Sequence, residues 1–143
     1  MKSADTIEQP TAPAASSNLV QMPLGILGFE QFKNYALLAD PAEKPFAWLK
    51  AVGEKPLSFV VIDPFVVLPD YQPEIPESDV NFLGIKQPGD ALLLGIVTIH
   101  GTNLVTMNLK GPVVINRHSH IGKQVIIANA TDYSVNHPLP VAA

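Results

Sequence analysis

The distribution of proline limits how this chain can fold more than any other feature of the sequence. Fourteen of the 143 residues are proline, about twice the usual share. Proline breaks helices and is excluded from the middle of central strands. Here the prolines separate short runs rich in Val, Ile, Leu and Phe, and no window longer than about ten residues shows a helical repeat. The chain is therefore predicted to form short strands rather than a helical bundle.

Seven segments have the composition of strands, namely residues 35–38, 46–52, 57–62, 91–99, 105–110, 113–116 and 123–128. The alternation in the fifth places Val105, Met107 and Leu109 toward a core and their neighbours toward water. Residues 28–33 and 78–83 are predicted to form short helical segments, the second with Ser78 as N-cap. We predict an all-β, small barrel-like domain of roughly seven to ten short strands and one or two short helices, with a flatter sandwich as the alternative.

Length and composition fit one domain with a core. We predict a disordered N-terminal tail over residues 1–18 and a compact domain over 19–143. Trp48 alternates with Phe46 and is expected in the core. No apolar run is long enough for a membrane span, and the N-terminus lacks the order of a secretory signal. We therefore expect a cytoplasmic, monomeric protein without membrane contact.

Charge is concentrated in one acidic segment, defined here as residues 63–79. It holds five carboxylates and no Lys or Arg, whereas the whole chain has a net charge of −4. Direct nucleic-acid binding needs clustered cations, which are missing. The acidic segment fits either a basic protein partner or a solvated loop that aids solubility. Within it, Asp63 is expected to bond nearby backbone N–H groups, and Tyr71 is expected to be exposed at an interface.

The search for catalytic chemistry is mostly negative. Cysteine is absent, which excludes thiolate nucleophiles and cysteine metal ligands, and no phosphate-binding or nucleophile-elbow motif occurs. His118 and His120 would form half of a metal site, with His100 as a further candidate. Their position between Asn116 and Gly122 favours a solvated turn instead. No cofactor is predicted, and a binding module fits better than an enzyme.

Seven phrases in a fixed order resemble one family. They are PLGILGFE from Pro23, FVVIDPF from Phe59, DYQPE from Asp70, LGIVTI from Leu94, NLKGPVVIN from Asn108, GKQVI from Gly122 and YSVNHPL from Tyr133. Over roughly residues 20–139 the chain resembles the FliW flagellar assembly factors. Two departures stand out. The strand-turn-strand that begins many members is reduced to residues 19–22, and Asn136 stands where Arg is expected.

The resemblance implies a small, non-catalytic, cytoplasmic protein that binds flagellin and the RNA-binding translational repressor CsrA. Binding of CsrA would relieve repression of flagellin mRNA. Alternatives are a divergent adaptor that has lost these partners, or a metal-dependent enzyme using His118 and His120. The candidate partner-binding residues lie in the acidic segment and in the later phrases, and they are Asp63, Phe65, Asp70, Tyr71, Glu74, Glu77, Asp79, Asn108, Asn116, Lys123, Tyr133 and His137.

Overall fold

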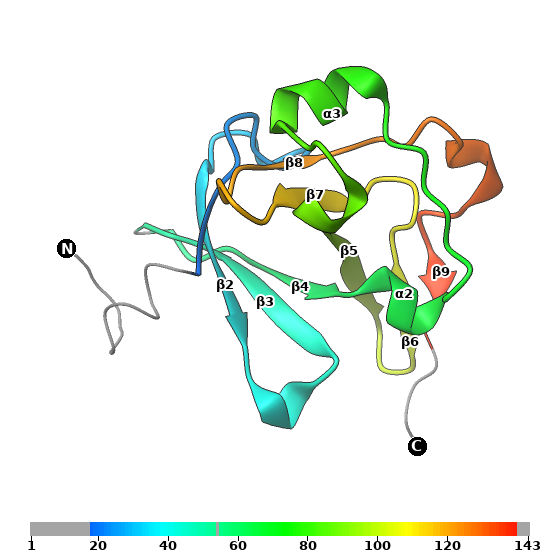
Figure 1. Ribbon diagram of the computed structural model, residues 1–143. Coiled ribbons are helices and arrows are strands. Elements are labelled where there is room, and N and C mark those ends of the chain that lie inside the picture. Colours follow the sequence, from blue (N-terminus) through cyan, green and yellow to red (C-terminus); the bar gives the residue numbers. More distant parts are fainter. Residues whose placement is uncertain (1–17, 54, 140–143) are drawn as a thin grey trace.

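A single antiparallel sheet organises the molecule (Figure 1). The computed structural model describes residues 18–53 and 55–139. The main path of the sheet runs in the order β1 (Leu19–Gln21), β2 (Asn34–Ala39), β3 (Phe46–Ala51), β4 (Ser58–Ile62), β5 (Ala91–His100), β6 (Leu104–Met107) and β9 (His137–Pro138). A branch adds β7 (Val113–Asn116) and β8 (Gly122–Gln124), because β7 pairs with both β5 and β8. The predicted all-β fold class is confirmed. The predicted N-terminal tail lies outside the described residues except for Asn18.

Strand β5 joins the two parts of the sheet. Its first four residues pair with β7, whereas Gly95–Val97 pair with β4 and Val97–His100 pair with β6. Ten residues without a proline make this the longest described strand. At the point where the pairing changes, Gly95 leaves room for the side chain of Met107. A Cβ built on Gly95 would lie 2.5 Å from Met107 Sδ.

Both faces of the sheet carry a core. One face packs Val20, Tyr35 and Leu49 against Leu94 and neighbouring apolar residues. The other packs residues such as Ile62, Val97, Met107, Leu109 and Leu139 against the segment that follows β4. Burial on both sides explains why the runs at 59–62 and 92–97 are apolar throughout, as expected for central strands covered on both faces.

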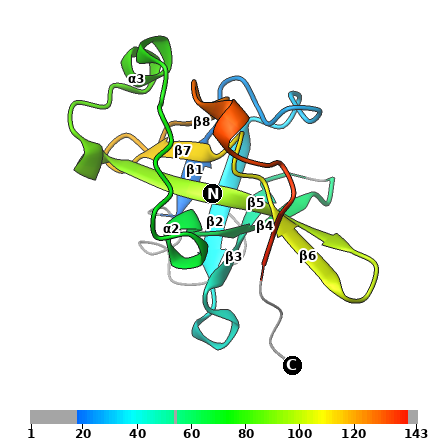
Figure 2. The ribbon, with the colours of Figure 1, turned by 90° about the vertical axis from the view of Figure 1, so that its right-hand side faces the viewer.

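Two short helices pack against the sheet. Helix α2 (Pro64–Val67) follows Asp63, whose Oδ1 accepts from the Phe65 N–H at 2.9 Å. Helix α3 (Glu77–Leu83) lies over β7 and β8, as Figures 1 and 2 show. Three 3-10 turns, η1 (Pro41–Glu43), η2 (Pro88–Asp90) and η3 (Ala130–Asp132), complete the described helical segments. The hydrogen bond that Asp63 accepts confirms the prediction that its carboxylate bonds a nearby backbone N–H.

Several local predictions are wrong. Residues 28–33 form turns rather than a helical turn, with Gly28 at φ 90° and its N–H donated to Glu30 Oε2. Helix α3 ends at Leu83 as predicted, before the left-handed Gly84, but it begins after Pro76 without a side-chain cap, so Ser78 is not its N-cap. The last predicted long strand stops at Gln124 rather than at residue 128.

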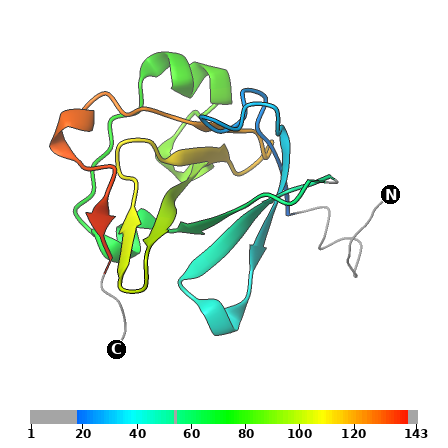
Figure 3. The same ribbon diagram turned by 180° about the vertical axis from the view of Figure 1, so that it is seen from behind.

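Strand β6 is also shorter than predicted. It ends at Met107, after which Asn108 Oδ1 accepts from the N–H groups of Lys110 and Gly111 to close a turn. Thr106 was expected to face water but is only 2% exposed. Strand β9 lies beside β6 (Figure 3) and places Pro138 opposite Thr106. The Thr106 hydroxyl donates to Asn136 Oδ1. Burial of Met107 is confirmed.

The close approach at Gly95 gives a stability prediction. The substitution Gly95→Ala forces Met107, which is fully buried, out of its position and should lower the free energy of unfolding by about 1–3 kcal/mol. The matched control is Gly89→Ala, because a Cβ there meets nothing within 4 Å and its φ is not positive. Chemical denaturation measures both variants. Equal stability of the two would show that the sheet absorbs the extra methyl group without cost.

Candidate protein-binding surfaces

One face of the sheet presents a continuous apolar row. The strand registers place Leu38 opposite Trp48, Trp48 opposite Val60, and Val60 opposite Val97. Directly opposed residues point to the same side of a sheet. The row therefore crosses β2, β3, β4 and β5 on the face that α2 also contacts.

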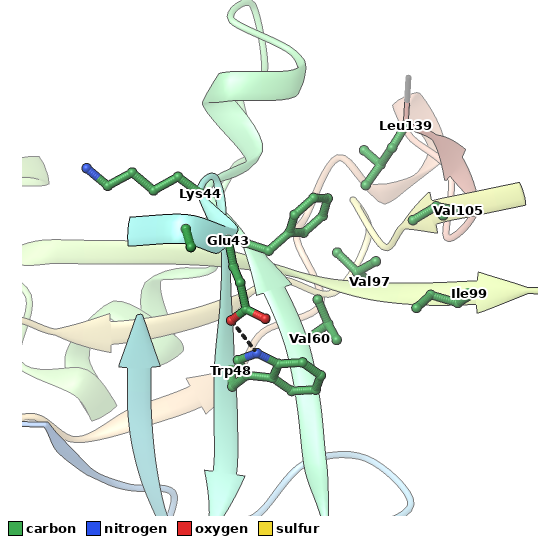
Figure 4. Close-up of a pocket in the computed structure, with 10 residues that line it drawn as sticks. Glu43, Lys44, Trp48, Val60, Val97, Ile99, Val105 and Leu139 are labelled. Atoms are coloured by element: carbon green, nitrogen blue, oxygen red, sulfur yellow. Dashed lines mark hydrogen bonds between the residues drawn. The ribbon is translucent and has the colours of Figure 1, made fainter. Parts of the chain in front are cut away.

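An apolar groove lies along this row. It encloses about 510 Å³, and Figure 4 shows its lining side chains on β3 to β6 around the 3-10 turn η1. The lining residues are Ala42, Glu43, Lys44, Phe46, Trp48, Val60, Val97, Ile99, Val105 and Leu139. We call this surface the apolar groove.

The apolar groove is open to solvent. Trp48 is 39% exposed and Ile99 is 64% exposed, so the prediction that Trp48 belongs to the core is wrong. The indole N–H of Trp48 donates to Glu43 Oε1 at 3.2 Å, which fixes the ring at the edge of the groove. Large exposed apolar patches mark interaction sites in soluble proteins. Eight of the ten lining residues are apolar, so the chemistry of the groove suits the binding of an apolar protein segment.

The acidic segment is fixed to the fold rather than loose. Tyr71 is only 2% exposed, which overturns the expectation of an exposed interface tyrosine. Its hydroxyl donates to the Leu109 carbonyl at 2.6 Å, and its ring packs edge-to-face on Tyr133. Burial raises the pKa of Tyr71, so this donor stays protonated. The Tyr133 hydroxyl accepts from the Gln72 N–H, which adds a second anchor.

The five carboxylates of the acidic segment have different surroundings. Asp79 is buried and pairs with Lys123, whose ammonium also lies 5.6 Å from the centre of the Phe82 ring. Asp63 is exposed but caps α2. The other three, Asp70, Glu74 and Glu77, are exposed and form no ion pair with another described residue. These three can act on a partner through their charge.

The acidic segment also carries exposed apolar side chains, which lie on α2. Phe65 is 42% and Val66 is 58% exposed, although the Phe65 ring packs against Tyr71. Both side chains are therefore accessible at the surface.

Other candidate residues have structural tasks. Asn116 is buried; its Nδ2 donates to the Leu83 carbonyl and its Oδ1 accepts from the His118 and Ser119 N–H groups. Asn116 thus caps the turn that follows β7. Asn108 closes the turn after β6. His137 lies in β9, where it pairs with Met107 of β6. The candidate residues thus do not meet in one site.

His118 and His120 do not form a metal site with other residues in the part of the chain that the structure describes. His118 lies in an exposed turn, and its Nε2 is 2.9 Å from Asp90 Oδ1. The hydrogen bond from His118 holds the pKa of Asp90 below its ordinary value. Among residues 18–53 and 55–139, no three His, Asp or Glu side chains are placed to hold a metal ion.

Asn136, where Arg was expected, forms part of a local hydrogen-bond chain. Its Oδ1 accepts from the Thr106 hydroxyl, and that hydroxyl in turn accepts from His100 Nε2 at 2.9 Å. The amide thus ties the segment before β9 to the β5–β6 hairpin without a charge.

Among the described residues, no helix is long and apolar enough to cross a membrane.

Sequence reasoning missed the apolar groove as a site. The signal was present in the alternation of Phe46 with Trp48 and of Val97 with Ile99. Alternation alone indicates which residues share a face, but it does not show whether another element covers that face.

Comparisons with known proteins agree on one family. The model of the FliW protein family matches residues 5–139. The flagellar assembly factor FliW of Leptospira interrogans is 40% identical over 113 residues, which cover 78% of this chain and 75% of that protein. The flagellar assembly factor FliW of Syntrophus aciditrophicus is 39% identical over 117 residues, covering 81% of this chain and 74% of that protein.

A solved structure supports the same assignment. A crystal structure of the flagellar assembly factor FliW superposes with a TM-score of 0.79 at 34% sequence identity, covering 94% of this chain and 91% of that one. The family match, the relatives and the shared fold together establish that this chain belongs to the FliW family of flagellar assembly factors.

Proposed function

We propose that this chain is a non-catalytic, cytoplasmic regulator that binds flagellin and CsrA and so relieves CsrA repression of flagellin mRNA. The observation that carries the proposal is the presence of two surfaces of different chemistry, the apolar groove and the acidic segment. One protein with two such surfaces is suited to two unlike partners. Membership in a family of flagellar assembly factors supports flagellin as one of them.

We assign flagellin to the apolar groove. Burial of apolar surface is the main driving force of most protein association. The half-exposed Trp48 offers the kind of large aromatic anchor that dominates the energetics of interfaces.

We assign CsrA to the acidic segment. A protein that binds RNA must present cationic surface to the phosphates. The exposed carboxylates Asp70, Glu74 and Glu77 would attract that surface. Once bound, they would repel RNA phosphates, so RNA binding would weaken even if its site stayed open.

The flagellin assignment is tested by placing a charge in the groove. Ile99→Asp buries an unpaired carboxylate in the interface and should weaken flagellin binding about tenfold or more. CsrA binding should stay unchanged. The matched control is Leu27→Asp, because Leu27 is 73% exposed and lies outside the groove lining. Isothermal titration calorimetry with each partner measures the four affinities. An Ile99→Asp variant with normal flagellin affinity would refute the assignment of flagellin to the groove.

The CsrA assignment is tested by neutralising only the exposed carboxylates. In the triple variant Asp70→Asn, Glu74→Gln, Glu77→Gln, the association rate of CsrA should fall several-fold and its salt dependence should flatten, because exposed charges act within a Debye length of about 8 Å. Asp79 is kept because its removal would leave the partly buried Lys123 without its partner. Surface plasmon resonance at low and high salt gives both quantities.

A charge-matched control separates local from overall charge. The variant Gln21→Lys, Gln31→Lys, Asn34→Lys changes the net charge by the same amount at exposed positions outside the acidic segment. It should alter CsrA association much less than the triple neutralisation does. Equal effects of the two variants on CsrA association would show that the acidic segment acts only through the net charge of the protein. If wild-type protein bound neither partner, the chain would be a divergent adaptor instead.

A further inference from the structure

We infer that the apolar groove receives an amphipathic α-helix whose polar flank is acidic. This inference deepens the proposed function, because the groove is the surface assigned to flagellin. It is argued from the backbone pairing of the groove strands, from the length of the apolar row, and from the charges on the same face.

Backbone pairing excludes strand addition as the mode of binding. Strands β3, β4 and β5 each have hydrogen-bonded neighbours on both sides, and β6 lies between β5 and β9. An extended peptide adds to a free sheet edge, where its N–H and C=O groups find partners. The groove lies on a face and offers no such partners. A segment that docks there must satisfy its own backbone groups, as a helix does.

The length of the apolar row suits a short helix. The row from Leu38 through Trp48 and Val60 to Val97 crosses three strand spacings, or about 14 Å at the usual separation of neighbouring strands. A helix rises 1.5 Å per residue, so nine or ten residues, roughly three turns, span that distance. Apolar residues at positions i, i+3, i+4 and i+7 of such a helix would face the row.

Charge in and beside the groove indicates the polar flank. Lys44 belongs to the groove lining, and Lys50 lies next to the lining residue Trp48 on the same face of β3, one register row further along, opposite Ala36 and Ser58. Both lysine side chains are exposed, and neither forms an ion pair with another described residue. The one carboxylate in the groove lining, Glu43, already accepts the Trp48 indole N–H. A helix with acidic residues beside its apolar stripe would complement this rim.

Synthetic peptides test the inference on the intact protein. Three peptides without Trp share one apolar stripe: one has Glu on the polar flank, one has Lys, and one repeats the Glu version with two central prolines. Trp48 is the only tryptophan of the chain, so its emission reports binding directly. At low salt the Glu peptide should shift the emission to the blue and bind about fivefold or more tightly than the Lys peptide. The proline peptide should not bind, because proline breaks the helix.

A charge reversal provides the matched variant. In Lys50→Glu the order of the Glu and Lys peptides should reverse, whereas Lys33→Glu, at an exposed lysine outside the groove, should leave the order unchanged. Equal binding of the proline peptide would overturn the helical mode, and an unchanged order in Lys50→Glu would overturn the acidic flank. A blue shift that rises with protein concentration alone would assign the groove to a second copy and overturn the inference.

Parallel titration with flagellin keeps the two proposals distinguishable. Flagellin binding that is sensitive to Ile99→Asp, with no binding of any peptide, would overturn the helical mode while leaving the proposed function in place. Peptide binding without flagellin binding would overturn the proposed function and support the helical groove.

Discussion

The pairing of β5 with three other strands is the constraint on which the rest of the structure depends. Its N-terminal half binds β7 and its C-terminal half lies between β4 and β6. The close contact of Gly95 with Met107 permits this change of partners. Because β5 joins both parts of the sheet, its side chains enter the cores on both faces. One face is then covered only in part by α2 and the following segment, and the uncovered remainder is the apolar groove.

The acidic segment owes its position to polar contacts with residues distant in the sequence. The Tyr71 hydroxyl reaches the Leu109 carbonyl, and the Asn129 side chain bonds the backbone of both Gln72 and Glu74. The ion pair of Asp79 with Lys123 holds α3 against β8. These contacts hold the exposed carboxylates in a fixed arrangement. A fixed charge arrangement supports selective attraction of a basic partner better than a mobile loop does.

Much of the fold could be predicted from the sequence. Proline spacing and apolar runs located the strands β2 to β7, because breakers and β-branched residues act locally. The cap at Asp63 and the turn at Asn116 were also predictable, since both follow from the short side chain and its neighbouring N–H groups. The exposure of Trp48 and the burial of Tyr71 were not predictable. Each depends on which distant segment covers it, and neither composition nor periodicity records that.

The central claim is that the open apolar face around Trp48 is the flagellin-binding surface. The most direct test is fluorine NMR on protein labelled with 5-fluorotryptophan, because the single tryptophan gives one signal from this chain whatever the partner contains. Saturating flagellin should shift or broaden that signal, and CsrA should leave it unchanged. A Trp48 signal unaffected by bound flagellin would contradict the account.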